Sequence, residues 1–311
     1  MVLWILGAVA LAFGVCALAV KMAVARNGAA VLNAVDRLTG GRGGAALLET
    51  VSTGDHAQQQ VLVWGPRKAT AATASLPVLL FVHGGSWASG NPVDYGFIGR
   101  AFVPKGFIVV LAGYRLGSDG RYPGMIEDTA SAIGWTRREI ARFGGDPARI
   151  TIAGHSAGAY NVMMTALEER WLAQEDVALS DIAAVVGLSG PYEIYPYTSD
   201  ASKAAFGHAE NPQATQPIAH IRGDAPPLLL IHGCDDETVR PKNTPILTQM
   251  IRDAGGEASA HMYPGMNHTA PLISLAAPWR KRRDIADKIA DFARSLKVSS
   301  DASVPVQGKT R

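Results

Sequence analysis

The chain has 311 residues, of which 48% are apolar and 18% charged, so it can bury a large core and is not a mainly disordered protein. This length suits one large α/β domain or two small ones. The formal net charge is +2, and the basic run at residues 280–283 is followed by aspartates at 284, 287 and 291. This balance argues against a nucleic-acid partner.

The first twenty residues carry no charged side chain and are mostly apolar. Twenty helical residues rise about 30 Å, enough to cross the hydrocarbon core of a bilayer. We therefore predict a transmembrane anchor over residues 1–25, which makes the membrane a partner. The basic residues after the segment favour a cytoplasmic catalytic domain.

Two alternatives to an anchor remain for this segment. One is a signal peptide cleaved near Ala25, which would make the protein secreted or periplasmic. Signal peptides carry basic residues before their apolar run, however, and none precede this one. The other alternative is a buried core helix.

The segment after the anchor, residues 26–48, contains glycines at 40, 41, 43 and 44 and is interpreted as a short helix with a flexible linker. The catalytic domain is predicted over residues 49–297, and residues 298–311 are expected to form a disordered tail. Within the domain, residues 60–64 alternate polar and apolar side chains as an edge strand does. Five short apolar runs and a last strand follow, at 78–82, 107–112, 150–153, 184–188, 228–231 and 258–263.

Helical patterns lie between these strands, at 125–143, 157–174, 241–254 and 281–296. Continuous apolar runs suit strands that are buried on both faces. The alternation therefore predicts an α/β fold with an open, mostly parallel central sheet and helices on both faces. Residues 190–223 are rich in Tyr, Pro and Ala without a long period, and we interpret them as a small lid insertion over the sheet's carboxyl edge.

A Gly-x-Ser-x-Gly sequence marks the candidate nucleophile. It runs from Gly154 to Gly158 around Ser156, after an apolar strand and before a helical pattern. A serine that projects from a sharp strand-to-helix turn crowds its neighbours, and glycine on both sides relieves that crowding. The N-terminus of the following helix favours developing negative charge. We therefore predict that Ser156 is a catalytic nucleophile.

The loop after the strand at 78–82 is the candidate oxyanion loop, and it reads His83-Gly84-Gly85-Ser86-Trp87. Glycines let such a loop approach a substrate closely. Preorganised N–H groups stabilise the oxyanion of acyl transfer, each by roughly 3 kcal/mol. We predict an oxyanion hole formed by the N–H groups of Gly85, Ser86 and Ala157, although which loop residues donate stays open. His83 is expected to brace the loop.

The acid and the base of such a hydrolase follow the nucleophile in the chain order Ser, acid, His. The strand at 228–231 leads into His232-Gly233-Cys234-Asp235-Asp236-Glu237, where a carboxylate can orient the catalytic imidazole. Asp236 is the first choice, with Asp235 and Glu237 as alternatives. His268, in the loop after the last strand, is the predicted general base. The other histidines, including His232, are interpreted as structural, surface or lid residues.

Taken together, these motifs resemble the α/β-hydrolase superfamily, and more narrowly its carboxylesterase branch. That branch holds hormone-sensitive-lipase-like esterases, feruloyl-esterase-like enzymes, isoprenylcysteine methylesterases and kynurenine formamidases. Besides residues 83–87 and 154–158, Tyr114-Arg115-Leu116 and residues 143–147 carry the resemblance, which spans about residues 55–296. It implies a Ser156–Asp236–His268 triad without a metal or a cofactor. Ser86 and Trp87 stand where the branch often has a third glycine, which favours the formamidase and methylesterase side.

The motifs thus predict a serine hydrolase that cleaves carboxylic esters of small to medium acyl groups through an acyl-enzyme. Trp87 and Tyr192 are candidate substrate-binding residues, since an aromatic ring offers apolar area and tyrosine adds a hydroxyl. The alternative is an amide or formamide hydrolase of the kynurenine formamidase type. A third hypothesis is a catalytically inactive, membrane-tethered binding module.

Overall fold

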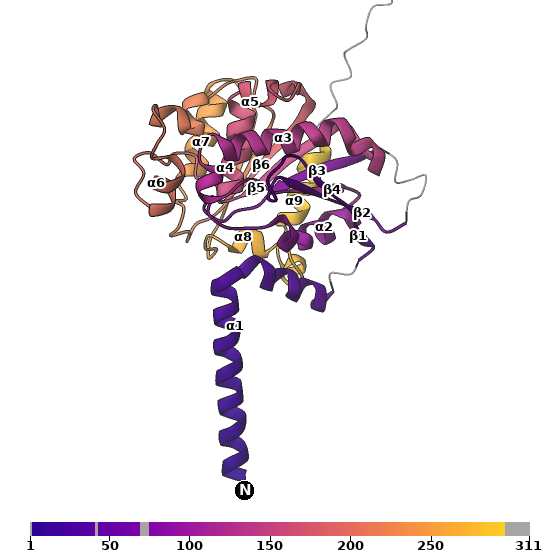
Figure 1. Ribbon diagram of the computed structural model, residues 1–311, viewed down its shortest axis with the longest axis vertical. Helices are drawn as coiled ribbons and strands as arrows, with labels where there is room; N and C mark the ends of the chain where they lie inside the picture. Colours follow the sequence, from indigo (N-terminus) through magenta and orange to yellow (C-terminus); the bar gives the residue numbers. More distant parts are fainter. Residues whose placement is uncertain (1, 41–42, 69–74, 296–311) are drawn as a thin grey trace, which may run out of the picture.

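A central sheet organises the molecule (Figure 1). The computed structural model describes residues 2–40, 43–68 and 75–295, and within these the sheet has eight strands. In chain order they are β1 (Ala45–Ser52), β2 (Gln60–Pro66), β3 (Leu76–Val82), β4 (Ile108–Ala112), β5 (Gly145–His155), β6 (Ile182–Leu188), β7 (Leu228–Gly233) and β8 (Ala258–Tyr263). Their spatial order is β1-β2-β4-β3-β5-β6-β7-β8. The pairs β1–β2 and β2–β4 are antiparallel. The other neighbours in this order, from β4 through β3 to β8, pair in parallel.

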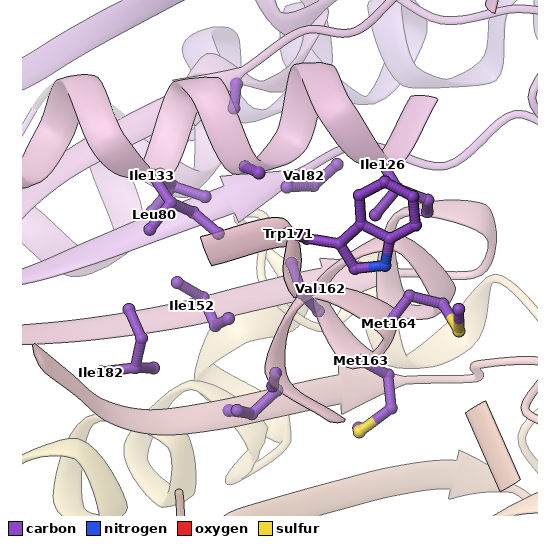
Figure 2. Packing of buried hydrophobic residues seen from close by; sticks show 14 of the residues in the cluster. Leu80, Val82, Ile126, Ile133, Ile152, Val162, Met163, Met164, Trp171 and Ile182 are labelled. Atoms are coloured by element: carbon purple, nitrogen blue, oxygen red, sulfur yellow. The ribbon is translucent and has the colours of Figure 1, made fainter. Parts of the chain in front are cut away.

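Helices cover both faces of this sheet, which confirms the predicted fold class (Figure 1). The helices are α1 (Val2–Thr39), α2 (Gly96–Phe102), α3 (Gly124–Glu139), α4 (Ala157–Leu167), α5 (Arg170–Ala173), α6 (Asp200–Phe206), α7 (Asn243–Asp253), α8 (Ala270–Ile273) and α9 (Ile285–Ser295). Successive strand residues point to opposite faces. Leu80 and Val82 therefore pack with α3, α4, α5 and α7, whereas Leu79 and Phe81 pack with α2, α8 and α9. Figure 2 shows the first of these cores, where Leu80 of the sheet lies beside Ile133, and Trp171 lies near Ile126 and Met164.

Four elements, β1, α2, α6 and α8, escaped the sequence prediction, and the first two lack the burial pattern that such a prediction needs. β1 is mostly exposed, with Leu47 and Leu48 on the surface, so it shows no alternation. It takes the edge position that had been predicted for residues 60–64. Helix α2 shows no helical periodicity of apolar and polar residues, because every one of its residues is buried.

Helix α1 consists of two parts that meet at Asn27, whose backbone is non-helical (φ −156°, ψ 85°). The Asn27 side chain caps the second part by accepting a hydrogen bond from the N–H of Ala30 (3.0 Å). The first part extends away from the domain, while the second lies against it (Figure 1). The short helix predicted after residue 25 is present as this second part of α1, and β1 begins at Ala45, within the stretch 26–48. Leu32 and Asp36 of the second part are buried.

The predicted transmembrane anchor over residues 1–25 is not supported. Among the described helices, none combines the length and the apolar character needed to cross a bilayer. The tail predicted at residues 298–311 lies outside the described residues.

Candidate active site

The predicted catalytic residues meet at the carboxyl edge of the sheet. Ser156 follows β5, Asp236 lies in the loop after β7, and His268 lies in the loop after β8. The oxyanion loop, residues 83–87, follows β3, the neighbour of β5. Parallel strands end at one edge, so loops that are far apart in the sequence converge there, as binding sites of open α/β sheets do.

Ser156 occupies the turn between β5 and α4 in a strained conformation (φ 54°, ψ −120°). The two flanking glycines are required by space. A Cβ on Gly154 would lie 2.3 Å from the carbonyl group of Gly158, and a Cβ on Gly158 would lie 2.1 Å from the carbonyl oxygen of Val82. The close approach of α4 to β5 and β3 therefore depends on these glycines, and it turns the Ser156 side chain out of the sheet.

The side chains of Ser156, His268 and Asp236 form one hydrogen-bonded line. His268 Nδ1 lies 2.7 Å from Asp236 Oδ2, and His268 Nε2 lies 2.9 Å from Ser156 Oγ. Because a carboxylate only accepts hydrogen bonds, Nδ1 carries the proton and donates it. Nε2 is then the acceptor for the Ser156 hydroxyl. This is the geometry that a general base needs to remove the hydroxyl proton.

Asp236 is held by four donors. Its Oδ1 accepts the N–H groups of Thr238 (2.9 Å) and Val239 (2.8 Å), and its Oδ2 faces His268 and His232. Burial alone would raise the pKa of Asp236, but hydrogen bonds from His232, His268 and the Val239 amide outweigh burial and hold that pKa well below its ordinary value. The neighbouring alternatives, Asp235 and Glu237, are exposed. The structure therefore favours Asp236 among the three.

The oxyanion loop has consecutive left-handed residues, with φ of 125° at Gly85, 55° at Ser86 and 57° at Trp87. Such angles are strained for residues with a Cβ and persist only where the surroundings impose them. The carbonyl of Gly85 accepts the N–H groups of Ala88 and Ser89, both at 3.0 Å. The His83 ring stacks on Tyr114 at 4.6 Å between ring centres, and its Nδ1 lies 2.8 Å from the carbonyl oxygen of Gly84 in this loop.

A pocket of about 460 Å³ opens beside the nucleophile. Its lining includes Ser86, Trp87, Ser156 and Ala157, together with residues between 191 and 202, in the stretch predicted to form a lid, and residues between 238 and 243. Gly85, the third predicted oxyanion donor, is not among the lining residues. Trp87 reaches the pocket, but its ring is mostly buried between Tyr160 and Phe206.

Tyr192 is not where the substrate-binding prediction requires it. Its side chain is completely buried and packs on Gly187 and Gly190, and its hydroxyl finds no hydrogen-bond partner among the described residues. Asn243 Oδ1 accepts the backbone N–H of Tyr192 at 2.8 Å, which fixes this part of the lid region. Tyr195, three residues later, is 41% exposed and lines the pocket instead.

His232 is the site residue that sequence reasoning missed. Its Nε2 lies 3.0 Å from Asp236 Oδ2, and both side chains are completely buried. The available signal was its spacing, since His232 lies one residue before the end of β7 and Asp236 follows four residues later. That spacing says nothing about which way the connecting loop turns.

Two other histidines beneath the site make stability depend on pH. Burial lowers the pKa of His83 to about 4, and burial together with nearby His268 lowers that of His155 to about 3. An unfolded chain binds these protons below pH 6.5 while the folded protein does not, so stability falls as the pH falls. Between pH 7 and pH 5 we expect each histidine to remove about 2 kcal/mol from the free energy of unfolding.

Urea unfolding at pH 7 and pH 5 measures this loss. In a His155→Gln variant, the difference between the two pH values should shrink by about 2 kcal/mol. A variant with the wild-type difference would show that His155 contributes no such dependence.

Comparison with known sequences finds a family model and relatives that are named esterases. Residues 66–251, more than half of the chain, match the BD-FAE family model. Esterase LipQ of Mycobacterium tuberculosis is 29% identical over 80% of this chain and 62% of its own length. The probable isoprenylcysteine alpha-carbonyl methylesterase ICME of Oryza sativa is 26% identical over 85% of this chain and 68% of its own. The chain thus spans less than two thirds of the first of these curated relatives.

Solved structures share the fold. Esterase B from Lactobacillus rhamnosis superposes with a TM-score of 0.71 at 18% identity, covering 90% of this chain and 96% of that one. Thermogutta terrifontis esterase 2, phosphoramylated by tabun, gives a TM-score of 0.68 at 21% identity, covering 81% and 95%. At these identities the likeness to solved structures shows the fold alone. The membership of a family comes from the match to the BD-FAE model. The chain belongs to the BD-FAE family and has the α/β-hydrolase fold.

Proposed function

We propose that the protein is a serine carboxylesterase that cleaves esters of small to medium acyl groups. The observation that carries this proposal is the hydrogen-bonded line from Ser156 Oγ through His268 to Asp236, with distances of 2.9 and 2.7 Å. A nucleophile, a base and an orienting carboxylate in this arrangement are the parts that acyl transfer needs. Relatives named as esterases and methylesterases support an ester as the bond cleaved.

In the proposed reaction, Ser156 Oγ attacks the ester carbonyl while His268 Nε2 takes its proton. The resulting oxyanion is stabilised by backbone N–H groups, for which we propose Gly85, Ser86 and Ala157. The intermediate collapses by breaking the bond to the alcohol, which leaves with the proton from His268 and yields an acyl-enzyme. A water molecule, deprotonated by His268, then attacks the acyl-enzyme, and the carboxylic acid and free Ser156 are released.

The pocket supports the proposed size of the acyl group. Its volume of about 460 Å³ lies at the small end of the range typical of sites for small molecules. The exposed Tyr195 and the mostly buried Trp87 both line this pocket beside Ser156 and offer it aromatic surface.

A substrate panel on the full-length chain tests the proposal. We expect p-nitrophenyl acetate and butyrate to be hydrolysed with a kcat/KM at least tenfold above that for N-formylkynurenine, and a fluorophosphonate probe to label Ser156. A higher kcat/KM for N-formylkynurenine than for the esters would favour the formamide hydrolase over the esterase. If the protein neither hydrolysed these substrates nor was labelled by the probe, the hypothesis of a catalytically inactive binding module would remain.

A further inference from the structure

His232 makes contacts that the proposed reaction has not yet used. It is the fifth residue of β7, and its side chain is completely buried. Its Nε2 lies 3.0 Å from Asp236 Oδ2 and 3.1 Å from the carbonyl oxygen of Val239, while its Nδ1 lies 2.9 Å from Thr244 Oγ1. Both ring nitrogens are therefore engaged, one with the acid loop and the other with α7.

The partners determine where the proton of this ring lies. A carboxylate and a carbonyl only accept hydrogen bonds, so Nε2 must carry a proton and donate it. The Thr244 hydroxyl can donate to Nδ1, and a single ring proton then satisfies every contact. Thr244 is itself buried in the first turn of α7. The chain Thr244–His232–Asp236–His268–Ser156 is consequently continuous, with each hydrogen bond no longer than 3.0 Å.

We propose that His232 is a positioning residue for Asp236 and, through it, for the base His268. This role rests on the proposed hydrolase function. Asp236 Oδ1 is occupied by the N–H groups of Thr238 and Val239, which leaves Oδ2 for His268. His232 donates to that same oxygen and so prevents the carboxylate from turning away from His268 Nδ1. Burial of a carboxylate costs free energy that its hydrogen bonds offset, so the loss of one donor leaves part of this cost uncompensated.

The consequence is an effect on the rate of chemistry rather than on substrate binding. His232 does not line the pocket, so a substrate cannot touch it. Replacing it by Leu keeps most of the volume and removes the donor. We expect His232→Leu to lower kcat for p-nitrophenyl butyrate by roughly 10- to 100-fold, the loss seen when an outer hydrogen-bond partner is removed at metal sites. KM should stay within about threefold.

Rescue distinguishes positioning from simple packing. A Gln side chain can present an amide N–H near the place of Nε2, so His232→Gln should recover most of kcat. Thr244→Val leaves Nε2 free to donate to Asp236 and should cost less than about threefold. The proposal is overturned if His232→Leu keeps kcat within twofold, or if the Leu and Gln variants lose activity equally. An equal loss in Thr244→Val would likewise mean that packing alone is at work.

The rate of labelling by a fluorophosphonate probe separates this proposal from the function on which it rests. Wild-type protein that fails to label would contradict the hydrolase function itself. Wild-type protein that labels, with His232→Leu labelling at the same rate, would contradict the positioning role alone. Urea unfolding of every variant shows whether the folded state is intact when the rates are compared.

Discussion

Ser156→Ala is expected to lower kcat for p-nitrophenyl butyrate on the order of 10⁴-fold or more, because it removes the atom that attacks the carbonyl. The fold should survive this change. Ser156 is held at a positive φ by the elbow, and alanine meets no more steric strain there than serine does. The lost hydrogen bond to His268 should cost only about 1 kcal/mol of stability. Ester hydrolysis and urea unfolding measure the two effects.

Ser118→Ala is the matched control for this variant. Ser118 is exposed in the loop at residues 117–120, and its hydroxyl contacts only the neighbouring Asp119 among the described residues. The control should keep wild-type kcat and wild-type labelling by a fluorophosphonate. If Ser156→Ala hydrolysed the ester within tenfold of the wild-type rate, the nucleophile would have to lie elsewhere.

The comparison of sequence and structure shows which parts of the site a motif can convey. Ser156 and Asp236 were found because each follows a strand whose end is buried on both faces, and such strands are visible as continuous apolar runs. His268 follows the half-buried β8 and was found from the chain order Ser, acid, His. The end of a strand in a parallel sheet has a known place, namely the carboxyl edge. The position of those residues at this edge of the sheet could therefore be predicted from the sequence.

The pocket walls were less accessible to this reasoning. Tyr192 and Tyr195 occur in one Tyr- and Pro-rich stretch without a period, so nothing in the sequence tells which ring points inward. The choice is made by Asn243, fifty-one residues away from Tyr192, which binds the backbone of Tyr192 and Glu193. His232 was missed for a similar reason, since its contact with Asp236 depends on how the loop after β7 returns.

The attachment of α1 is the other feature that no local pattern could reveal. Asp36 is completely buried and accepts hydrogen bonds from Arg100 Nε (2.6 Å), Arg280 (2.7 Å) and the N–H of Ala277 (2.7 Å). Its partners come from α2 and from the segment after α8, more than sixty residues away in the chain. The second part of α1 is thus fixed to the domain by a carboxylate shared between two guanidinium groups.

Asp36→Asn is expected to lower the free energy of unfolding by about 3–5 kcal/mol, the range measured when one partner of a buried ion pair is removed. The variant leaves two guanidinium groups side by side with no anion between them, and the side chain of Arg100 is only 8% exposed. Like charges at this distance repel each other, and burial keeps water from screening them. Urea unfolding at pH 7 measures the loss.

Asp287→Asn provides the contrast that makes this measurement decisive. Asp287 also pairs with a cation, Lys105, but its side chain is 62% exposed. Exposed pairs contribute about 0–1 kcal/mol, so this variant should unfold close to the wild-type urea concentration. If Asp36→Asn were no more destabilised than Asp287→Asn, the second part of α1 would not be held by its buried carboxylate. Its attachment would then have to come from its other contacts, such as the packing of Leu32 and the hydrogen bond from Asn33 to the Val93 carbonyl.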